Sequence, residues 1–147
     1  MSHVPTIGGV SAFIIQDHLL LYKNGERPCR VMCGLTQALS EEQISEIAEH
    51  YAAQEFVAAA QEFDTEKAAV GARIHRAKCE RCHWDGGSNA DDDAAILAGQ
   101  WIPYLEQAFA DFASGVRVSL ENKMTEKLNE LDAEQTEALI HYYASQQ

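Results

Sequence analysis

An internal repeat constrains the fold of this chain more than any other feature. Residues 39–54, LSEEQISEIAEHYAAQ, match residues 131–146, LDAEQTEALIHYYASQ, at a constant offset of 92 that also places Met32 on Met124. Further towards the N-terminus the offset is 90, and a two-residue insertion accounts for the change. Similarity of this extent indicates two copies of one folding unit within the 147 residues.

The two copies are unequal in extent. Residues 64–90 have no counterpart, because the matching positions would precede Met1. We therefore divide the chain into an incomplete unit over 1–60 and a complete domain over 61–147. A half-unit rarely buries enough surface to be stable alone. We expect that the chain is truncated or that its start lies further upstream, rather than that the first unit has lost its beginning.

Capping patterns and apolar spacing predict an all-α fold. The predicted helices span 41–55, 65–79, 100–113 and 133–145. The first and last of them open with capping-box patterns, Ser40 with Gln43 and Asp132 with Gln135. A loop rich in Gly, Asn and Asp covers 85–93. No segment alternates in the way a strand would.

The charge balance excludes several classes of partner. The net charge of −12 argues against binding to nucleic acid or to an anionic membrane surface. Residues 1–60 carry 3 basic and 7 acidic side chains, and residues 61–147 carry 8 and 16, so no basic docking patch is evident from the sequence. No apolar run reaches the length of a membrane span.

The motif Cys79-Glu-Arg-Cys82-His83 is compatible with three kinds of site. A closed zinc site of four thiolates would need Cys29 and Cys33 in addition, but the repeat places the two cysteine pairs in different parts of the folding unit. A thioredoxin-like pair begins a helix that follows a strand, whereas this pair ends a predicted helix. A covalent haem anchor requires the spacing C-x-x-C-H, which is present.

The haem interpretation explains more of the chain than the other two. Two thiols one helical turn apart form thioethers to the haem vinyl groups, and the histidine that follows lies beneath the iron. A low-spin electron carrier needs a second axial ligand, and Met124, which we expect in a loop before the last helix, is well placed. Met32 occupies the matching position of the first copy. The zinc alternative, with Cys29, Cys33, Cys79 and Cys82 as ligands, stays open.

These residues resemble the class I c-type cytochromes. Gly71 lies eight residues before Cys79, as in the N-terminal helix of that family, and ALIHYY resembles the aromatic part of its last helix, with Tyr142 in the contact position. The segments ILAGQ, YLEQAFADFASGVR and NKMTEKLNELDAEQTEALIHYYASQ resemble tandem dihaem members, above all the cytochrome subunit of flavocytochrome c sulfide dehydrogenase. The resemblance covers residues 64–147 and, as the later part of a first domain, residues 4–56.

The resemblance implies a class I cytochrome c fold preceded by the C-terminal part of a second cytochrome-like unit. It also implies one covalent haem c, with Cys79 and Cys82 as thioether anchors, His83 as proximal ligand and Met124 as distal ligand. Met32 would match the distal ligand of a first haem whose attachment motif is missing. The family further implies a periplasmic location and electron transfer from a flavoprotein that oxidises sulfide.

Several residues depart from the family pattern or allow two interpretations. His75 stands where the family has an aromatic residue, and Ala95 stands where a proline begins the P-x-L-A-G-Q stretch. Arg117 would bind a haem propionate, or it is a solvated surface residue. Cys29 and Cys33 could pair, stay free or bridge two chains. The expected apolar wall of the haem site consists of Ile96, Leu97, Trp101, Leu105, Leu120 and Leu128.

We predict outer-sphere transfer of single electrons, with no substrate at the iron because the chain fills both axial positions. The partner is then a flavoprotein sulfide dehydrogenase subunit or another redox protein. The sequence leaves two roles open: a haem subunit of that dehydrogenase, or a free-standing shuttle between respiratory complexes. It also leaves open whether the protein forms a dimer.

Overall fold

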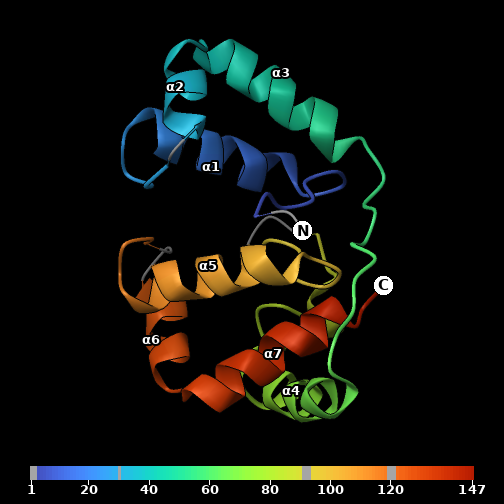
Figure 1. Cartoon of the computed structure of the whole chain (residues 1–147). Coiled ribbons are helices and arrows are strands. Elements are labelled where there is room, and N and C mark those ends of the chain that lie inside the picture. The colour runs from blue at the N-terminus through green and yellow to red at the C-terminus, as the bar shows by residue number, and fades with distance from the viewer. Residues whose placement is uncertain (1–2, 30, 91–93, 119–121) are drawn as a thin grey trace. The chain divides into compact units, whose positions relative to one another are not determined.

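The computed structural model describes residues 3–29, 31–90, 94–118 and 122–147 (Figure 1). This part of the chain contains helices and turns but no strand, which confirms the all-α prediction. None of its helices is long and apolar enough to cross a membrane. The elements are α1 (Ala12–Lys23), α2 (Met32–Gln37), α3 (Glu41–Ala52), α4 (Thr65–Lys78), the 3₁₀ helix η1 (Asp85–Gly87), α5 (Ile102–Ala113), α6 (Lys123–Asn129) and α7 (Ala133–Ala144).

The chain divides into two compact units. Unit 1 holds α4 to α7 and comprises Met1–Thr6, Val57–Asn89 and Ile96–Gln147, whereas unit 2 holds α1 to α3 and comprises Ile7–Phe56 and Ala90–Ala95. The Gln100 side chain ties the start of the chain to unit 1, since it accepts from Thr6 N at 2.9 Å and donates to Thr6 O at 2.7 Å. The division predicted from the sequence differs from this one, because it assigned all of residues 1–60 to the incomplete unit.

The helix boundaries follow the repeat. Helix α1 corresponds to α5 at the offset of 90, and α3 corresponds to α7 at the offset of 92, and each of these four helices has 12 residues. In unit 1, α5 packs against α6 and α7; in unit 2, α1 packs against α2 and α3. The two units therefore share one arrangement of three helices, and α4 is additional to it in unit 1.

Local capping explains where the predicted helices begin. The Ser40 hydroxyl accepts from Gln43 N at 3.1 Å, and the Gln43 side chain accepts from Ser40 N at 2.9 Å. Asp132 and Gln135 form the same reciprocal pair at the start of α7. Asp64 caps α4 by accepting from two backbone N–H groups of the first turn. Both capping boxes predicted from the sequence are confirmed.

Three helices were missed in the sequence. Helix α1 has apolar residues on most of its faces, so its periodicity is weak, although Ser11 caps it. Helices α2 and α6 have six and seven residues, which is too short for a clear pattern. The expectation that Met32 and Met124 lie in loops is therefore wrong: both methionines lie in the first turn of these short helices.

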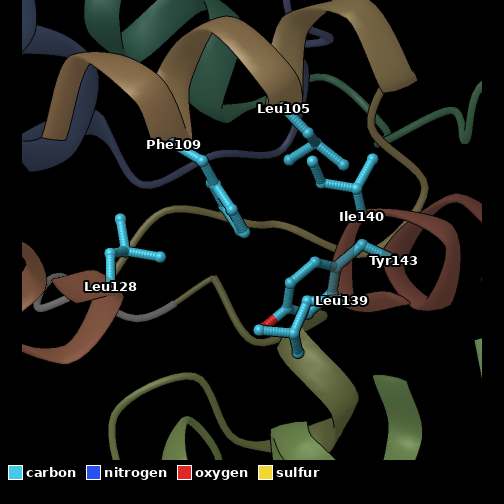
Figure 2. Packing of buried hydrophobic residues seen from close by; sticks show 6 residues of the cluster. All are labelled: Leu105, Phe109, Leu128, Leu139, Ile140 and Tyr143. Atoms are coloured by element: carbon cyan, nitrogen blue, oxygen red, sulfur yellow. The ribbon is translucent and has the colours of Figure 1, made fainter. Parts of the chain in front are cut away.

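Gly71 permits a close crossing of two helices in unit 1. Helix α4 packs against α7, as Figure 1 shows, and a Cβ at Gly71 would overlap the carbonyl oxygen of Ala138 and lie 2.7 Å from the Tyr142 Cβ. The predicted role of this glycine is confirmed. In the same unit, α5, α6 and α7 enclose one apolar cluster (Figure 2), formed by Leu105, Phe109, Leu128, Leu139, Ile140 and Tyr143.

Candidate functional site

The Cys-x-x-Cys-His motif lies in a tight turn at the end of α4. Cys79 is the C-terminal cap of that helix. Its carbonyl oxygen accepts from Cys82 N at 3.1 Å and from His83 N at 2.9 Å. Because one carbonyl closes both hydrogen bonds, the three side chains of the motif are carried by a single turn of backbone.

One pocket of unit 1 brings the predicted ligands together. Cys79, Cys82 and His83 come from the turn after α4, and Met124 comes from α6. The pocket has a volume of about 60 Å³. The complete lining consists of Lys78, Cys79, Cys82, His83, Leu97, Phe109, Lys123, Met124, Lys127, Leu128, Leu131, Leu139 and Tyr143.

The apolar wall of this pocket was predicted in part. Leu97 and Leu128 line the pocket. Ile96, Trp101 and Leu105 do not line it, and Ile96 and Leu105 are buried in the core instead. Leu120 lies outside the described residues. The wall residues that were missed are Phe109, Leu131, Leu139 and Tyr143. Three of them lie on the predicted helices 100–113 and 133–145, so helical spacing could have identified them.

Three lysines also line the pocket, although the sequence showed no basic patch. One of them, Lys78, belongs to α4, and the other two, Lys123 and Lys127, belong to α6. Lys78 and Lys123 are 45 residues apart in the sequence. Lys78 and Lys127 both pair with Glu130, at 3.2 and 2.8 Å. The charge of each half of the chain could not show this local excess of lysine, because folding collects it from two helices.

A buried polar group adjoins the pocket at His75. His75 Nδ1 lies 2.9 Å from the Tyr143 hydroxyl, and Nε2 pairs with the Glu80 carboxylate. Burial lowers the pKa of His75, although Glu80 opposes the shift. The ring also packs against Tyr142 and Tyr143, with centroids 5.2 and 5.5 Å away. The His75 imidazole thus packs as a planar ring at the position where the class I c-type cytochromes have an aromatic residue.

The two motif thiols differ in their surroundings. Burial raises the pKa of the Cys79 thiol, although a hydrogen bond with Tyr143 partly opposes the shift. Cys82 is exposed, and neither sulfur is in a disulfide. A thiol with a raised pKa is a weak nucleophile at neutral pH. This environment does not favour the dithiol redox interpretation.

Cys29 and Cys33 form a disulfide in unit 2, with their Cα atoms 5.8 Å apart. This settles the three alternatives left open for them in favour of pairing. It also removes both sulfurs as thiolate ligands, so the four-cysteine zinc interpretation is wrong. Among the residues with described positions, no group of three or more His, Cys, Asp or Glu side chains could hold a metal ion.

Arg117 does not line the pocket and is 5% exposed, which contradicts the interpretation as a solvated surface residue. Its guanidinium lies 4.3 Å from the centroid of the Phe112 ring. The matching pair in unit 2, Arg27 and Tyr22, has the same contact at 4.5 Å. A contact present in both copies belongs to the common scaffold, and propionate binding by Arg117 stays a prediction.

The donor set of the pocket fits haem c. Two thiols, an imidazole and a thioether converge on a pocket with apolar walls. These are the groups that attach and axially ligate a c-type haem.

No protein-family model matches the sequence, and no curated protein matches it. Solved structures do match. Cytochrome c4 from Pseudomonas stutzeri has a TM-score of 0.88 at 22% identity, over 97% of this chain and 85% of that chain. Cytochrome c4 from Acidithiobacillus ferrooxidans has a TM-score of 0.83 at 23% identity, over 97% of this chain and 89% of that chain.

A third match is thiosulfate dehydrogenase TsdBA from Marichromatium purpuratum. The TM-score is 0.85 at 22% identity, over 99% of this chain but only 33% of that chain, so the present chain spans about one third of it. Together the matches show that the chain has the class I cytochrome c fold. The predicted fold class is confirmed.

Proposed function

We propose that this protein is a c-type cytochrome that carries one covalent haem c and transfers single electrons. The observation that carries the proposal is the convergence of Cys79, Cys82, His83 and Met124 on one apolar pocket. The fold shared with cytochromes c4 supports it. The single C-x-x-C-H motif of the chain supports a count of one haem.

Each residue of the pocket has a distinct task in this proposal. Cys79 and Cys82 would hold the haem through thioethers, and His83 and Met124 would be its axial ligands. The bound haem supplies a one-electron redox couple. With His83 and Met124 both bound to the haem, the chain would leave no position there for a substrate. The apolar side chains around the pocket exclude water and lower the local dielectric constant, which favours the less charged, reduced state.

We further propose that the electrons come from a periplasmic redox protein, specifically a flavoprotein that oxidises sulfide. The sequence resemblance supports this partner, and the thiosulfate dehydrogenase among the structural matches supports a role in sulfur oxidation more broadly. A free-standing shuttle between respiratory complexes is the alternative. Stable co-purification with a flavin-containing subunit from the native host favours the first, and isolation as a lone cytochrome favours the second.

A pyridine haemochrome assay combined with intact mass tests the central proposal. The protein should be produced in a host that attaches haem c. We expect a c-type haemochrome spectrum and the mass of the chain plus one haem. An unmodified polypeptide mass from that host contradicts the proposal.

The repeat supplies a matched pair of variants for the axial ligand. Met124→Leu should remove the methionine-to-iron absorption band of the oxidised protein in the near infrared, and Met32→Leu should leave it unchanged. If neither variant changes the band, or if the band is absent from the unmodified protein, Met124 is not the ligand. In the second case the site would be open, as in a haem sensor or a peroxidase.

A further inference from the structure

Unit 1 has a second, larger hollow. A groove of about 550 Å³ lies between α5, the end of α6 and the start of α7. Its floor is formed by buried Phe109, Leu128 and Ile140. Three carboxylates stand among its lining residues, those of Glu106, Asp132 and Glu137. The groove therefore combines an apolar floor with acidic side chains.

Unit 2 carries larger side chains at the positions that match the small residues of the groove, although Thr36 and Ala48 are smaller than the matching Leu128 and Ile140. The four substitutions are Leu20 for Ala110, Lys23 for Ala113, Glu41 for Ala133 and Ile44 for Thr136. Ile44 is fully buried, which shows that unit 2 packs this position tightly.

The contacts of Lys23 in unit 2 show that backbone carbonyl oxygens around this space bind an ammonium group. Its ammonium donates to the carbonyl oxygen of Leu39 at 2.5 Å and to that of Thr36 at 3.5 Å. These carbonyls lie at and just beyond the C-terminal end of α2, where lysine side chains are favoured. By the repeat, the same carbonyls in unit 1 are those of Leu131 and Leu128, and both residues line the groove. Ala113, in the place of Lys23, has no donor.

We propose that the groove is a docking site for a lysine side chain of a basic partner protein. Its ammonium would bind the carbonyl oxygens of Leu128 and Leu131, as that of Lys23 binds the matching carbonyls in unit 2. The Glu106 carboxylate adds to the attraction for a cation, whereas Glu137 is paired with Lys67 and Asp132 caps α7. The net charge of −12 attracts a basic partner at longer range.

The size of the groove favours a protein over a free amine. The groove is much larger than one lysine stem, so residues beside the lysine would also contact its apolar floor. Phe109, Leu128 and Leu131 line both this groove and the pocket of the cysteine motif. If the proposed function holds, a partner docked here lies one layer of side chains from the haem. The docking itself does not depend on haem.

Peptide titration followed by amide NMR tests the site. The probe is acetyl-Ala-Ala-Lys-Ala-Ala-amide, and its control carries norleucine, which keeps the aliphatic stem and lacks the ammonium. We expect saturable shifts of the amides around Ala113, Leu128 and Leu131, with about tenfold weaker binding of the norleucine peptide, because charge-assisted hydrogen bonds are lost. Equal binding of the two peptides, or no saturable shift in the groove, overturns the proposal.

Two variants replace a residue of the groove with the residue that unit 2 has at the matching position. Ala113→Lys supplies the internal ammonium, and Thr136→Ile fills the space without a change of charge; both should abolish binding of the lysine peptide. Ala69→Lys, on the exposed surface of α4, has the same charge change and should bind as the parent does. Unchanged binding in folded Thr136→Ile, or equal loss in Ala69→Lys, contradicts the proposal. If Ala113→Lys does not fold, Thr136→Ile decides alone.

Discussion

The last helices of the two units, α3 and α7, have the same length and the same type of cap but differ sharply in burial. Tyr143 of α7 is 1% exposed, whereas its repeat equivalent in α3, Tyr51, is 39% exposed. Helix α7 buries five residues and α3 buries two. Helix α4 packs on α7, and the repeat gives α3 no matching segment within the chain. Local sequence thus forms the helix, and the presence of a partner helix decides what the helix buries.

The units also differ in what surrounds their matching methionines. Met124 shares its pocket with the cysteines and histidine of the motif, which α4 and the following turn bring to it. Met32 stands beside Cys33, which is held in a disulfide. The same short helix therefore carries a methionine in both units, and in unit 1 other candidate ligands share its pocket.

Truncation of the matched tyrosines should give the largest difference between the units. Tyr143→Ala removes a fully buried ring and should lower the free energy of unfolding by about 3–5 kcal/mol. Tyr51→Ala should cost less, about 1 kcal/mol, since its side chain is partly exposed to solvent. Denaturant unfolding of both variants measures the two values. Equal losses would mean that α3 is covered as fully as α7.

A methyl group at the helix crossing should have the next largest effect. Gly71→Ala forces α4 away from α7 and should destabilise the protein by about 1–3 kcal/mol. The control is Gly34→Ala in α2, where a Cβ meets no atom within 4 Å. That variant should be stabilised by about 0.5–1 kcal/mol, because alanine is the better helix former. A neutral Gly71→Ala would show that the crossing can open at little cost.

Removal of the two helix caps should, in contrast, affect the units alike. Ser40→Ala and Asp132→Ala each leave a first-turn N–H without its side-chain acceptor, and each should cost about 1 kcal/mol. Thermal unfolding of both variants tests this expectation. A cap that matters in only one unit would show that burial, and not local hydrogen bonding, fixes the start of that helix.

The smallest effect should be a pH dependence specific to unit 1. Burial lowers the pKa of His75 below the value near 6.5 that it has when unfolded. The unfolded chain therefore binds the proton more readily, so stability is complete above that pH and falls as the pH drops through it. His75→Phe should reduce this dependence, as measured by unfolding between pH 5 and 8. His50→Phe, at an exposed position on α3, should retain it.

Part of the structure was predictable because it is local. Both capping boxes and the four predicted helices were inferred from spacing along the chain, and the resemblance to the cytochromes implied the glycine crossing. The C-x-x-C-H motif identified three of the four candidate ligands at the pocket. Three helices could not be predicted, since α1 lacks a polar face and α2 and α6 are too short to show a period.

The sequence alone determined that the chain is helical, that it repeats, and that one half carries a haem-type motif, because each depends on residues near one another in the chain. Only the tertiary structure decided which side chains meet. It placed Phe109, Leu139 and Tyr143 around the candidate ligands, collected three lysines at the same pocket, paired Cys29 with Cys33 and left a groove at Ala113. These outcomes depend on packing between distant segments, which spacing along one helix does not specify.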